Sequence, residues 1–168
     1  MLVYALMFLG IFMRLIPHAP NFVPVAAIAL FSGAYLDRKI VPWVPLAIMV
    51  LSDVILGMHD VVLYTWGAFA LTALIGMFLK ERTSPGYIIG ATVVSSVLFY
   101  VITNFGVWMA WYPRTFDGMA QCYINALPFL RNTMAGNIIF SGILFGTYEA
   151  ALRFVSQKQL RMVLIASK

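Results

Sequence analysis

Residues 14–33 read RLIPHAPNFVPVAAIALFSG and join two apolar runs through a short turn that contains Pro17, His18 and Pro20. Proline fixes its own φ angle and has no amide hydrogen, so two closely spaced prolines make a stiff connection. The pattern predicts two helices joined by a rigid turn. We expect this turn to hold His18 and Asn21 in fixed positions.

The composition is typical of an integral membrane protein. Hydrophobic residues make up 62% of the 168 residues and charged residues only 10%, whereas a soluble domain carries about 25% charged residues. The net charge of +5 fits the topology of a membrane protein, and we expect no role in nucleic-acid binding. The single cysteine, Cys122, excludes an intrachain disulfide and a cysteine metal cluster. We predict one membrane domain over residues 1–168.

Six apolar runs are predicted to be transmembrane helices of an all-α fold. A helix needs about 20 residues to cross the hydrocarbon core, and the first two runs are shorter than this. Only the connection 108–135 is long, and its pattern predicts a short outer helix over 116–127 that ends at Pro128. The six predicted spans are 2–16, 21–36, 40–57, 61–79, 87–107 and 136–155.

The basic residues predict how the chain is oriented in the membrane. With a cytoplasmic N-terminus, only Arg14, Arg114 and Arg131 of the 11 Lys and Arg residues lie on the outer side, as the positive-inside rule requires. An even number of spans then places both termini in the cytoplasm. We therefore expect a multi-pass protein of the inner (cytoplasmic) membrane.

Two further features lie near the cytoplasmic end of the last span. Glu149 and Arg153 are four residues apart, a spacing that favours an ion pair on one helix face. The tail 156–168 mixes basic and apolar residues, so it is either an amphipathic helix on the membrane surface or a frayed end.

Polar residues gather at the outer ends of the predicted spans. Arg14 and Asp53 lie inside apolar runs, where an unpaired charge costs about 3 kcal/mol or more, so we expect them to pair with each other, to anchor a ligand, or both. The aromatic residues of the long connection suit either an interfacial belt or, together with nearby amides, a pocket for a flat molecule with polar edges. The predicted ligand-binding residues are Arg14, His18, Asn21, Asp53, His59, Asn104, Trp108, Trp111, Tyr112, Cys122 and Asn132.

The chain contains none of the common catalytic motifs, such as GxSxG, HExxH or a phosphate-binding glycine loop. His18, His59 and Cys122 lack the spacing of a zinc site, so we expect neither a metal nor a cofactor, and no enzymatic activity. Two alternatives stay open. One is an integral-membrane enzyme in which Cys122 acts with His18 or His59 as its base, and the other is a membrane scaffold protein that transports nothing.

Four stretches carry a resemblance to a known family. They are residues 14–33 as quoted above, PLAIMVLSDVILGMH at 45–59, SSVLFYVITNFGVW at 95–108 and CYINALPFLRNTMAGNIIFSGILFG at 122–146. Together they resemble an uncharacterised family of six-span bacterial transport proteins. That family is in turn similar to the substrate-binding S components of energy-coupling-factor (ECF) vitamin transporters.

The resemblance implies a function and a set of partners. It implies that the outer face binds a small molecule for uptake, such as a vitamin, a cofactor precursor or a similar heterocycle. Besides the lipid bilayer, the implied partner is an ECF-type energising module, in which ATPases drive a membrane scaffold subunit. In S components, small-residue motifs of span one contact that scaffold, and here span one offers Ala5 and Gly10 in place of an AxxxA pair.

Overall fold

A computed structural model describes the backbone of residues 2–166 and the side chains of residues 2–155. Over this part of the chain the backbone forms seven helices and no strand, so the predicted all-α fold is confirmed. Each predicted span overlaps one of these helices. The helices are α1 (Leu2–Leu15), α2 (Val25–Tyr35), α3 (Trp43–Leu56), α4 (Val62–Met77), α5 (Pro85–Trp111), α6 (Phe116–Asn125) and α7 (Leu127–Ala166).

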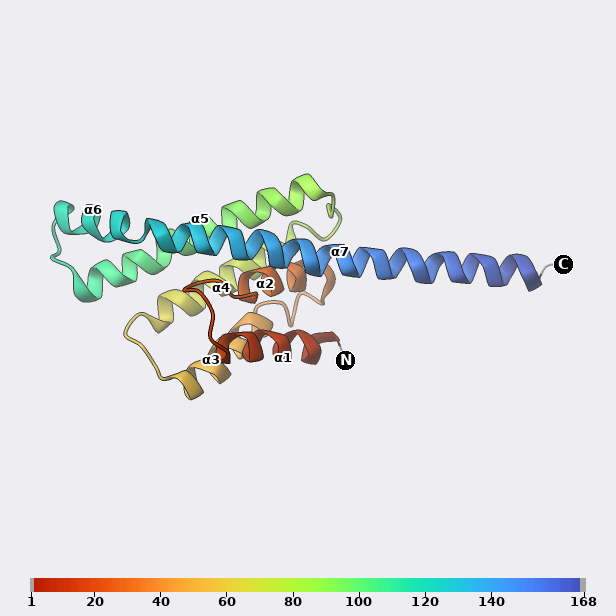
Figure 1. Cartoon of the computed structure of the whole chain (residues 1–168), viewed down its shortest axis with the longest axis horizontal. Helices are drawn as coiled ribbons and strands as arrows, with labels where there is room; N and C mark the ends of the chain where they lie inside the picture. Colours follow the sequence, from red (N-terminus) through yellow and green to blue (C-terminus); the bar gives the residue numbers. More distant parts are fainter. Residues whose placement is uncertain (1, 167–168) are drawn as a thin grey trace.

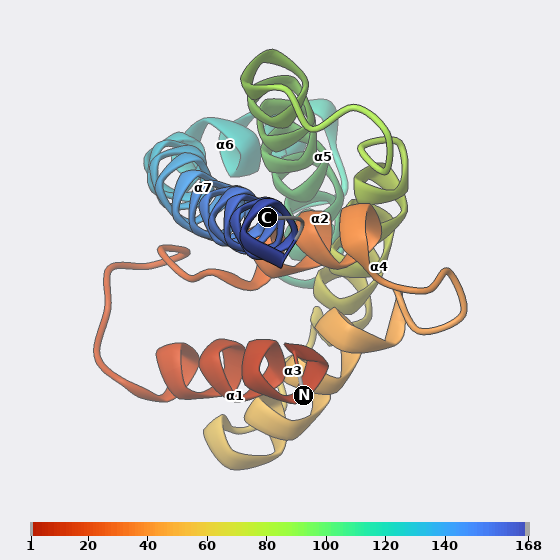
Figure 2. The same cartoon turned by 90° about the vertical axis from the view of Figure 1, so that its right-hand side faces the viewer.

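Helix α2 lies at the centre of the fold (Figure 2). Every residue from Val25 to Ala34 is buried, and α2 contacts every other helix except α6. A helix that is apolar on all sides is one that its neighbours enclose. The 11 residues of α2 rise only about 16 Å, so it is a short central helix around which the longer helices pack.

Helix α2 begins four residues later than the predicted run 21–36. Asn21 has a left-handed backbone with φ of 61°, a conformation that Asn tolerates better than most residues. Pro24 stands directly before the first helical residue, where its missing amide hydrogen removes no helical hydrogen bond. Residues 16–24 therefore form an irregular, proline-rich segment between α1 and α2, which we call the α1–α2 loop.

Glycines bring neighbouring helices into close contact. A Cβ atom added to Gly33 of α2 would overlap the backbone of Gly76 in α4, and one added to Gly76 would overlap the backbone of Leu30. Small residues of this kind let two helix backbones approach each other. Gly10 of α1 likewise lies against the side chain of Ile48 in α3, and α1 and α3 form a pair on one side of α2 (Figure 2).

Helices α5 and α7 pack against each other and against α2. Helix α6 lies at the end of the molecule where α5 ends and α7 begins, and α7 extends beyond the other helices at the opposite end (Figure 1). The tail 156–168 continues α7 as a helical backbone to Ala166. The membrane-surface face predicted for this tail depends on side chains that lie outside the described residues.

The predicted long connection over 108–135 is wrong. In that stretch only residues 112–115 and Ala126 lie outside helices, because α5 extends to Trp111. The apolar pattern of α5 is interrupted by polar residues at its outer end, and this interruption imitates the end of a helix. Trp108 consequently lies on a helix instead of in a loop.

Pro128 starts a helix instead of ending one. The predicted short helix 116–127 ends at Asn125, and α7 begins at Leu127, well before the predicted start of the last span at residue 136. A proline in the first turn of a helix removes no helical hydrogen bond, because the first amides have no partner within the helix. Asn132 therefore also lies on a helix.

Two helices have the length and the apolar composition needed to cross a membrane, namely α5 and the stretch Leu127–Val155 of α7. Helices α1 to α4 are also apolar, but they contain only 11 to 16 residues each, against about 20 for a typical span. Helix length by itself thus supports two spans, fewer than the six predicted.

The predicted ion pair between Glu149 and Arg153 is wrong. Glu149 accepts a hydrogen bond of 2.5 Å from the hydroxyl of Tyr35 at the end of α2, and it forms no ion pair with Arg153 within the described side chains. An i, i+4 ion pair stabilises a helix by only about 0.5 kcal/mol. A hydrogen-bond partner on another helix can therefore replace it.

We expect Gly76→Ala to destabilise the protein by about 1 to 3 kcal/mol, because the new Cβ would overlap backbone atoms of Leu30 that cannot rotate away. Gly67→Ala on the same helix is the matched control, since a Cβ there meets no atom within 4 Å and alanine favours the helix. Thermal unfolding of the detergent-purified variants measures both. Equal stability of Gly76→Ala and the wild type would contradict the close contact between α2 and α4.

Candidate functional site

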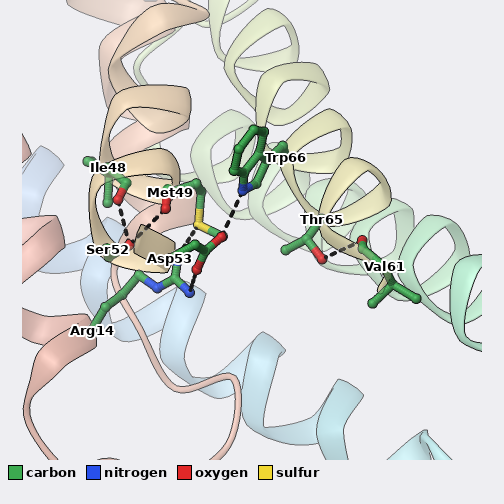
Figure 3. Close-up of polar contacts among 8 residues, drawn as sticks. All are labelled: Arg14, Ile48, Met49, Ser52, Asp53, Val61, Thr65 and Trp66. Carbon is green, nitrogen blue, oxygen red and sulfur yellow. Dashed lines mark hydrogen bonds and ion pairs between the residues drawn. The ribbon is translucent and has the colours of Figure 1, made fainter. Parts of the chain in front are cut away.

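A buried carboxylate organises one wall of the candidate site (Figure 3). Asp53 on α3 has no exposed surface. Its Oδ1 accepts a hydrogen bond of 2.6 Å from Nη2 of Arg14 on α1, and its Oδ2 accepts one of 2.8 Å from Nε1 of Trp66 on α4. Hydrogen bonds to an ionised carboxylate are among the strong ones in proteins. The predicted pairing of Arg14 with Asp53 is present. Together with the bond from Trp66 it joins three helices.

Two adjoining cavities lie beside this wall. We call the smaller one, of ≈ 120 Å³, the deep chamber, and the larger one, of ≈ 450 Å³, the vestibule. Together we call them the outer cavity, because the orientation predicted from the basic residues places them on the outer side. The two adjoin each other, because four residues line both of them: Arg14, Asn21, Thr65 and Phe99.

The deep chamber has a mixed polar and apolar lining that comes from the α1–α2 loop and from six helices. Its apolar wall consists of Val23, Ala26, Met49, Phe69 and Phe99. Its polar wall consists of Arg14, His18, Asn21, Thr65, Thr133 and Asn137. A small number of hydrogen-bonding groups on an otherwise apolar surface is typical of sites for small organic molecules.

The deep chamber carries one charged side chain, and its charge is matched. The side chain of Arg14 is 14% exposed and is bonded to the buried carboxylate of Asp53. The other polar side chains of the lining are amides, hydroxyls and an imidazole. Nδ1 of His18 lies 2.7 Å from the carbonyl oxygen of Ile16 and donates to it, since a carbonyl oxygen can only accept. Such a lining suits a molecule that is polar but uncharged.

The vestibule is lined by aromatic and amide side chains at the outer end of α5 and α6. Trp111 donates a hydrogen bond of 3.0 Å from Nε1 to Asp60, and Asn125 donates one of 3.3 Å to the hydroxyl of Tyr112. The first bond links α5 to the turn between α3 and α4, and the second links α6 to the end of α5. The vestibule walls are therefore held in place by polar contacts between elements.

Cys122 faces the vestibule but is not a freely accessible thiol. Its residue is 2% exposed, and its Sγ lies 3.5 Å from the carbonyl oxygen of Asn104, to which it donates. Burial raises the pKa of the Cys122 thiol, which reduces the thiolate fraction on which nucleophilic reactivity depends. Within the described residues, His18, His59 and Cys122 belong to no cluster of three or more metal-ligating side chains.

The α1–α2 loop lines part of the outer cavity and is fastened to α7. Nδ2 of Asn132 donates a hydrogen bond of 3.2 Å to the carbonyl oxygen of Pro20. Phe22 packs where Gly136 leaves room, since a Cβ at Gly136 would lie 3.2 Å from its ring. These contacts hold His18 and Asn21 of the loop at the rim of the deep chamber.

The structure brings most of the predicted site residues together. Those that line the outer cavity are Arg14, His18, Asn21, His59, Asn104, Trp111, Tyr112 and Cys122. Three predicted residues lie outside its lining. Asp53 stands behind Arg14, Asn132 binds the loop, and Nε1 of Trp108 donates to the carbonyl oxygen of Pro113 at 2.9 Å. Ligand binding by these residues stays a prediction.

Sequence reasoning missed Thr65 of the deep chamber and two further polar residues of its lining on α7, Thr133 and Asn137. The two α7 residues are buried, with exposed fractions of 5% and 2%. Their signal is present in the sequence, because Thr133, Asn137 and Ser141 follow one another at intervals of four and so share one face of a helix. The predicted residue, Asn132, is one position away and points about 100° around the helix.

Comparison with known proteins identifies a family for this chain but no function. The profile of a single protein family, described as a family of unknown function (DUF6580), matches residues 1–160. The chain belongs to this family. No curated protein matches the chain, and no solved structure does. Membership of DUF6580 agrees with the expected uncharacterised family, and the function has to be argued from the site.

We expect Arg14→Ala and Asp53→Ala each to destabilise the protein by roughly 3 kcal/mol, and more than the double variant does. Either single change leaves one charge without its partner in a buried site, whereas the double change removes both charges. Thermal unfolding of the four proteins gives the coupling energy. Strictly additive effects would show that the two side chains do not interact.

Proposed function

We propose that the chain is a six-span membrane protein that binds a small, polar, uncharged ring molecule in the outer cavity for uptake, in the manner of an ECF S component. The observation that carries the proposal is the outer cavity itself, with its matched charge and its mixed polar and apolar lining. Vitamins, cofactor precursors and similar heterocycles have the required combination of a flat apolar body and hydrogen-bonding edges. An ECF-type module of scaffold subunit and ATPases is the proposed energising partner.

The dimensions of the outer cavity support a ligand of this size. A cavity of about 150 Å³ admits one benzene molecule, so the deep chamber of ≈ 120 Å³ suits a single small ring. The vestibule of ≈ 450 Å³ has room for a substituent and offers Trp111 and Tyr112 as stacking surfaces. The ring edge would meet Thr133 and Asn137 on α7.

The six-span arrangement is supported by the surfaces of the short helices. Helix α1 exposes Tyr4 and Phe8, and α3 exposes Val54 and Ile55, each with more than 60% of its surface accessible. Apolar side chains exposed to this degree are suited to contact with lipid. Tilting, local thinning of the bilayer and flanking residues accommodate helices shorter than the hydrocarbon core. The positive-inside rule then places both termini in the cytoplasm.

The geometry of Cys122 favours binding over covalent chemistry. A thiol nucleophile needs a neighbouring base, but the polar contact of Cys122 is a backbone carbonyl, and burial raises the pKa of its thiol. We therefore propose that Cys122 packs against α5 as part of the vestibule wall, and that the protein is not an enzyme.

Single cysteines placed in a Cys122→Ser background test the topology. With six spans, we expect Lys39→Cys and Glu81→Cys to react with a membrane-impermeant maleimide only from the cytoplasmic side, and Met58→Cys and Asp117→Cys only from outside. All four positions are solvent-accessible in the fold. If only α5 and α7 cross the membrane, Lys39→Cys and Met58→Cys would react from the same side, and this result would refute the six-span arrangement.

We expect Thr133→Val to reduce ligand binding about tenfold, because it removes a hydroxyl from the deep chamber while keeping the side-chain shape. The matched control is Thr147→Val, an exposed position of α7 that lies outside the outer cavity. Mass spectrometry of small molecules that co-purify with the protein in mild detergent measures retention for both variants. Equal retention by Thr133→Val and Thr147→Val would contradict binding in the deep chamber.

A further inference from the structure

A third cavity lies between α5 and α7 at the end of the molecule opposite the vestibule. We call it the α5–α7 groove. It has a volume of ≈ 610 Å³ and is lined by Ser84 just before α5, by residues of the first turns of α5 up to Thr92, and by residues of α7 from Ile138 to Arg153. The proposed six-span arrangement places the segment between α4 and α5 in the cytoplasm, which makes the groove the counterpart of the outer cavity.

The groove and the deep chamber are separated by about one helical turn. Asn137 of α7 lines the deep chamber, and Ser141 of the same helix lines the groove. Four residues of an α-helix rise about 6 Å. On α5, Phe99 lines the deep chamber and Thr92 lines the groove, so Ser96 lies between the two cavities.

A column of neutral polar side chains fills this separation. Nδ2 of Asn137 donates to Oγ of Ser96 at 2.9 Å, and Oγ1 of Thr92 lies 3.2 Å from Oγ of Ser141. The Ser96 hydroxyl in turn donates to the carbonyl oxygen of Thr92 at 2.8 Å. The four side chains are at most 2% exposed. We call Thr92, Ser96, Asn137 and Ser141 the polar seam.

We propose that the polar seam is a gated passage, through which a small uncharged polar molecule moves from the deep chamber into the α5–α7 groove. The chain would then carry its ligand across the membrane between its own helices. This inference rests on the proposed function in one respect, that the outer cavity is the entrance. In the structure described here the seam is closed.

The energies involved allow the seam to open. A hydrogen bond between helices in a membrane is weak on average, so the two bonds that join α5 to α7 here offer little resistance to their own breaking. A passing polar molecule would exchange hydrogen bonds with the same hydroxyl and amide groups, which lowers the cost of removing its hydration shell. On the groove side, Gly142 and Gly146 leave open space, because a Cβ at either position meets no atom within 4 Å.

The chemistry of the seam also selects what can pass. All four of its side chains are neutral, so they cannot compensate the loss of hydration of an ion, which is far larger than that of a neutral polar group. The seam therefore fits an uncharged solute, in agreement with the matched charge of the deep chamber. A seam that served only to join two helices would need no cavity at either end.

Cysteine accessibility at Ser96 tests the passage. The full chain, with Cys122→Ser and Ser96→Cys, is reconstituted in liposomes and treated at mildly alkaline pH with iodoacetamide, itself a small uncharged polar molecule. The reagent is added on one side while glutathione on the other side traps any that crosses, and the experiment is then reversed. The matched control is Ser95→Cys, which is on the same helix and fully buried, but whose hydroxyl has no hydrogen-bond partner within the described residues.

We expect Ser96→Cys to react from both sides, and about tenfold faster than Ser95→Cys, since reaction requires access to the thiol. Reaction from one side only, or a rate equal to that of Ser95→Cys, would overturn the passage. Thr92→Cys repeats the test at a second seam position if Ser96→Cys folds poorly, as judged by gel filtration.

The result of the cysteine test can be distinguished from a failure of the proposed function. Unchanged ligand retention in Thr133→Val, together with reaction of Ser96→Cys from both sides, would remove the deep chamber as the binding site and leave the passage standing. Reduced retention in Thr133→Val, together with an unreactive Ser96→Cys, would support binding at the outer cavity and refute the passage.

Discussion

The ion pair between Arg14 and Asp53 is the constraint on which the outer half of the structure depends. An ionised carboxylate with no exposed surface is stable only where its oxygens receive strong hydrogen bonds, and here one bond comes from Arg14 and the other from Trp66. The pair therefore fixes α1 and α4 relative to α3. It also sets one wall of the deep chamber, because Arg14 cannot move away from Asp53 without leaving a buried charge unpaired. The same contact that stabilises the fold thus keeps the chamber near electrical neutrality.

Polar groups are used differently in the two halves of the molecule. Around the outer cavity, polar contacts such as the one between Trp111 and Asp60 hold the walls, and the space between the walls stays open. Between α5 and α7, polar contacts such as the one between Asn137 and Ser96 fill the space between the two helices, and no cavity lies there. Hydrogen bonds between neutral groups are weak compared with a buried ion pair. The contacts beside the deep chamber and those between α5 and α7 therefore differ in strength, because the first include a buried ion pair and the second do not.

Much of the candidate site was predictable because polar residues in an apolar chain are conspicuous. Arg14, His18 and Asn21 are found from their place beside the proline-rich turn, and Asn104 and Trp111 from the end of an apolar run. Thr133 and Asn137 were missed because the last span was predicted to begin at residue 136, so Thr133 was placed in a connection and not on one helix face with Asn137. Their shared helix face becomes evident only when the helix is known to begin at Leu127. The error at Pro128 and the omission of these residues have the same origin, namely that the start of α7 at Leu127 was not predicted.

The sequence by itself determined that the chain is helical, where most of its helices lie, and that its polar residues collect at one end, because hydrophobic periodicity and proline act locally. Only the tertiary structure decided which helix is central and which side chains meet. The short α2 is enclosed because Gly33 and Gly76 permit backbone contact, and Glu149 bonds to Tyr35 instead of its helical neighbour. Such choices depend on contacts between residues far apart in the chain, and local pattern contains no information about those distances.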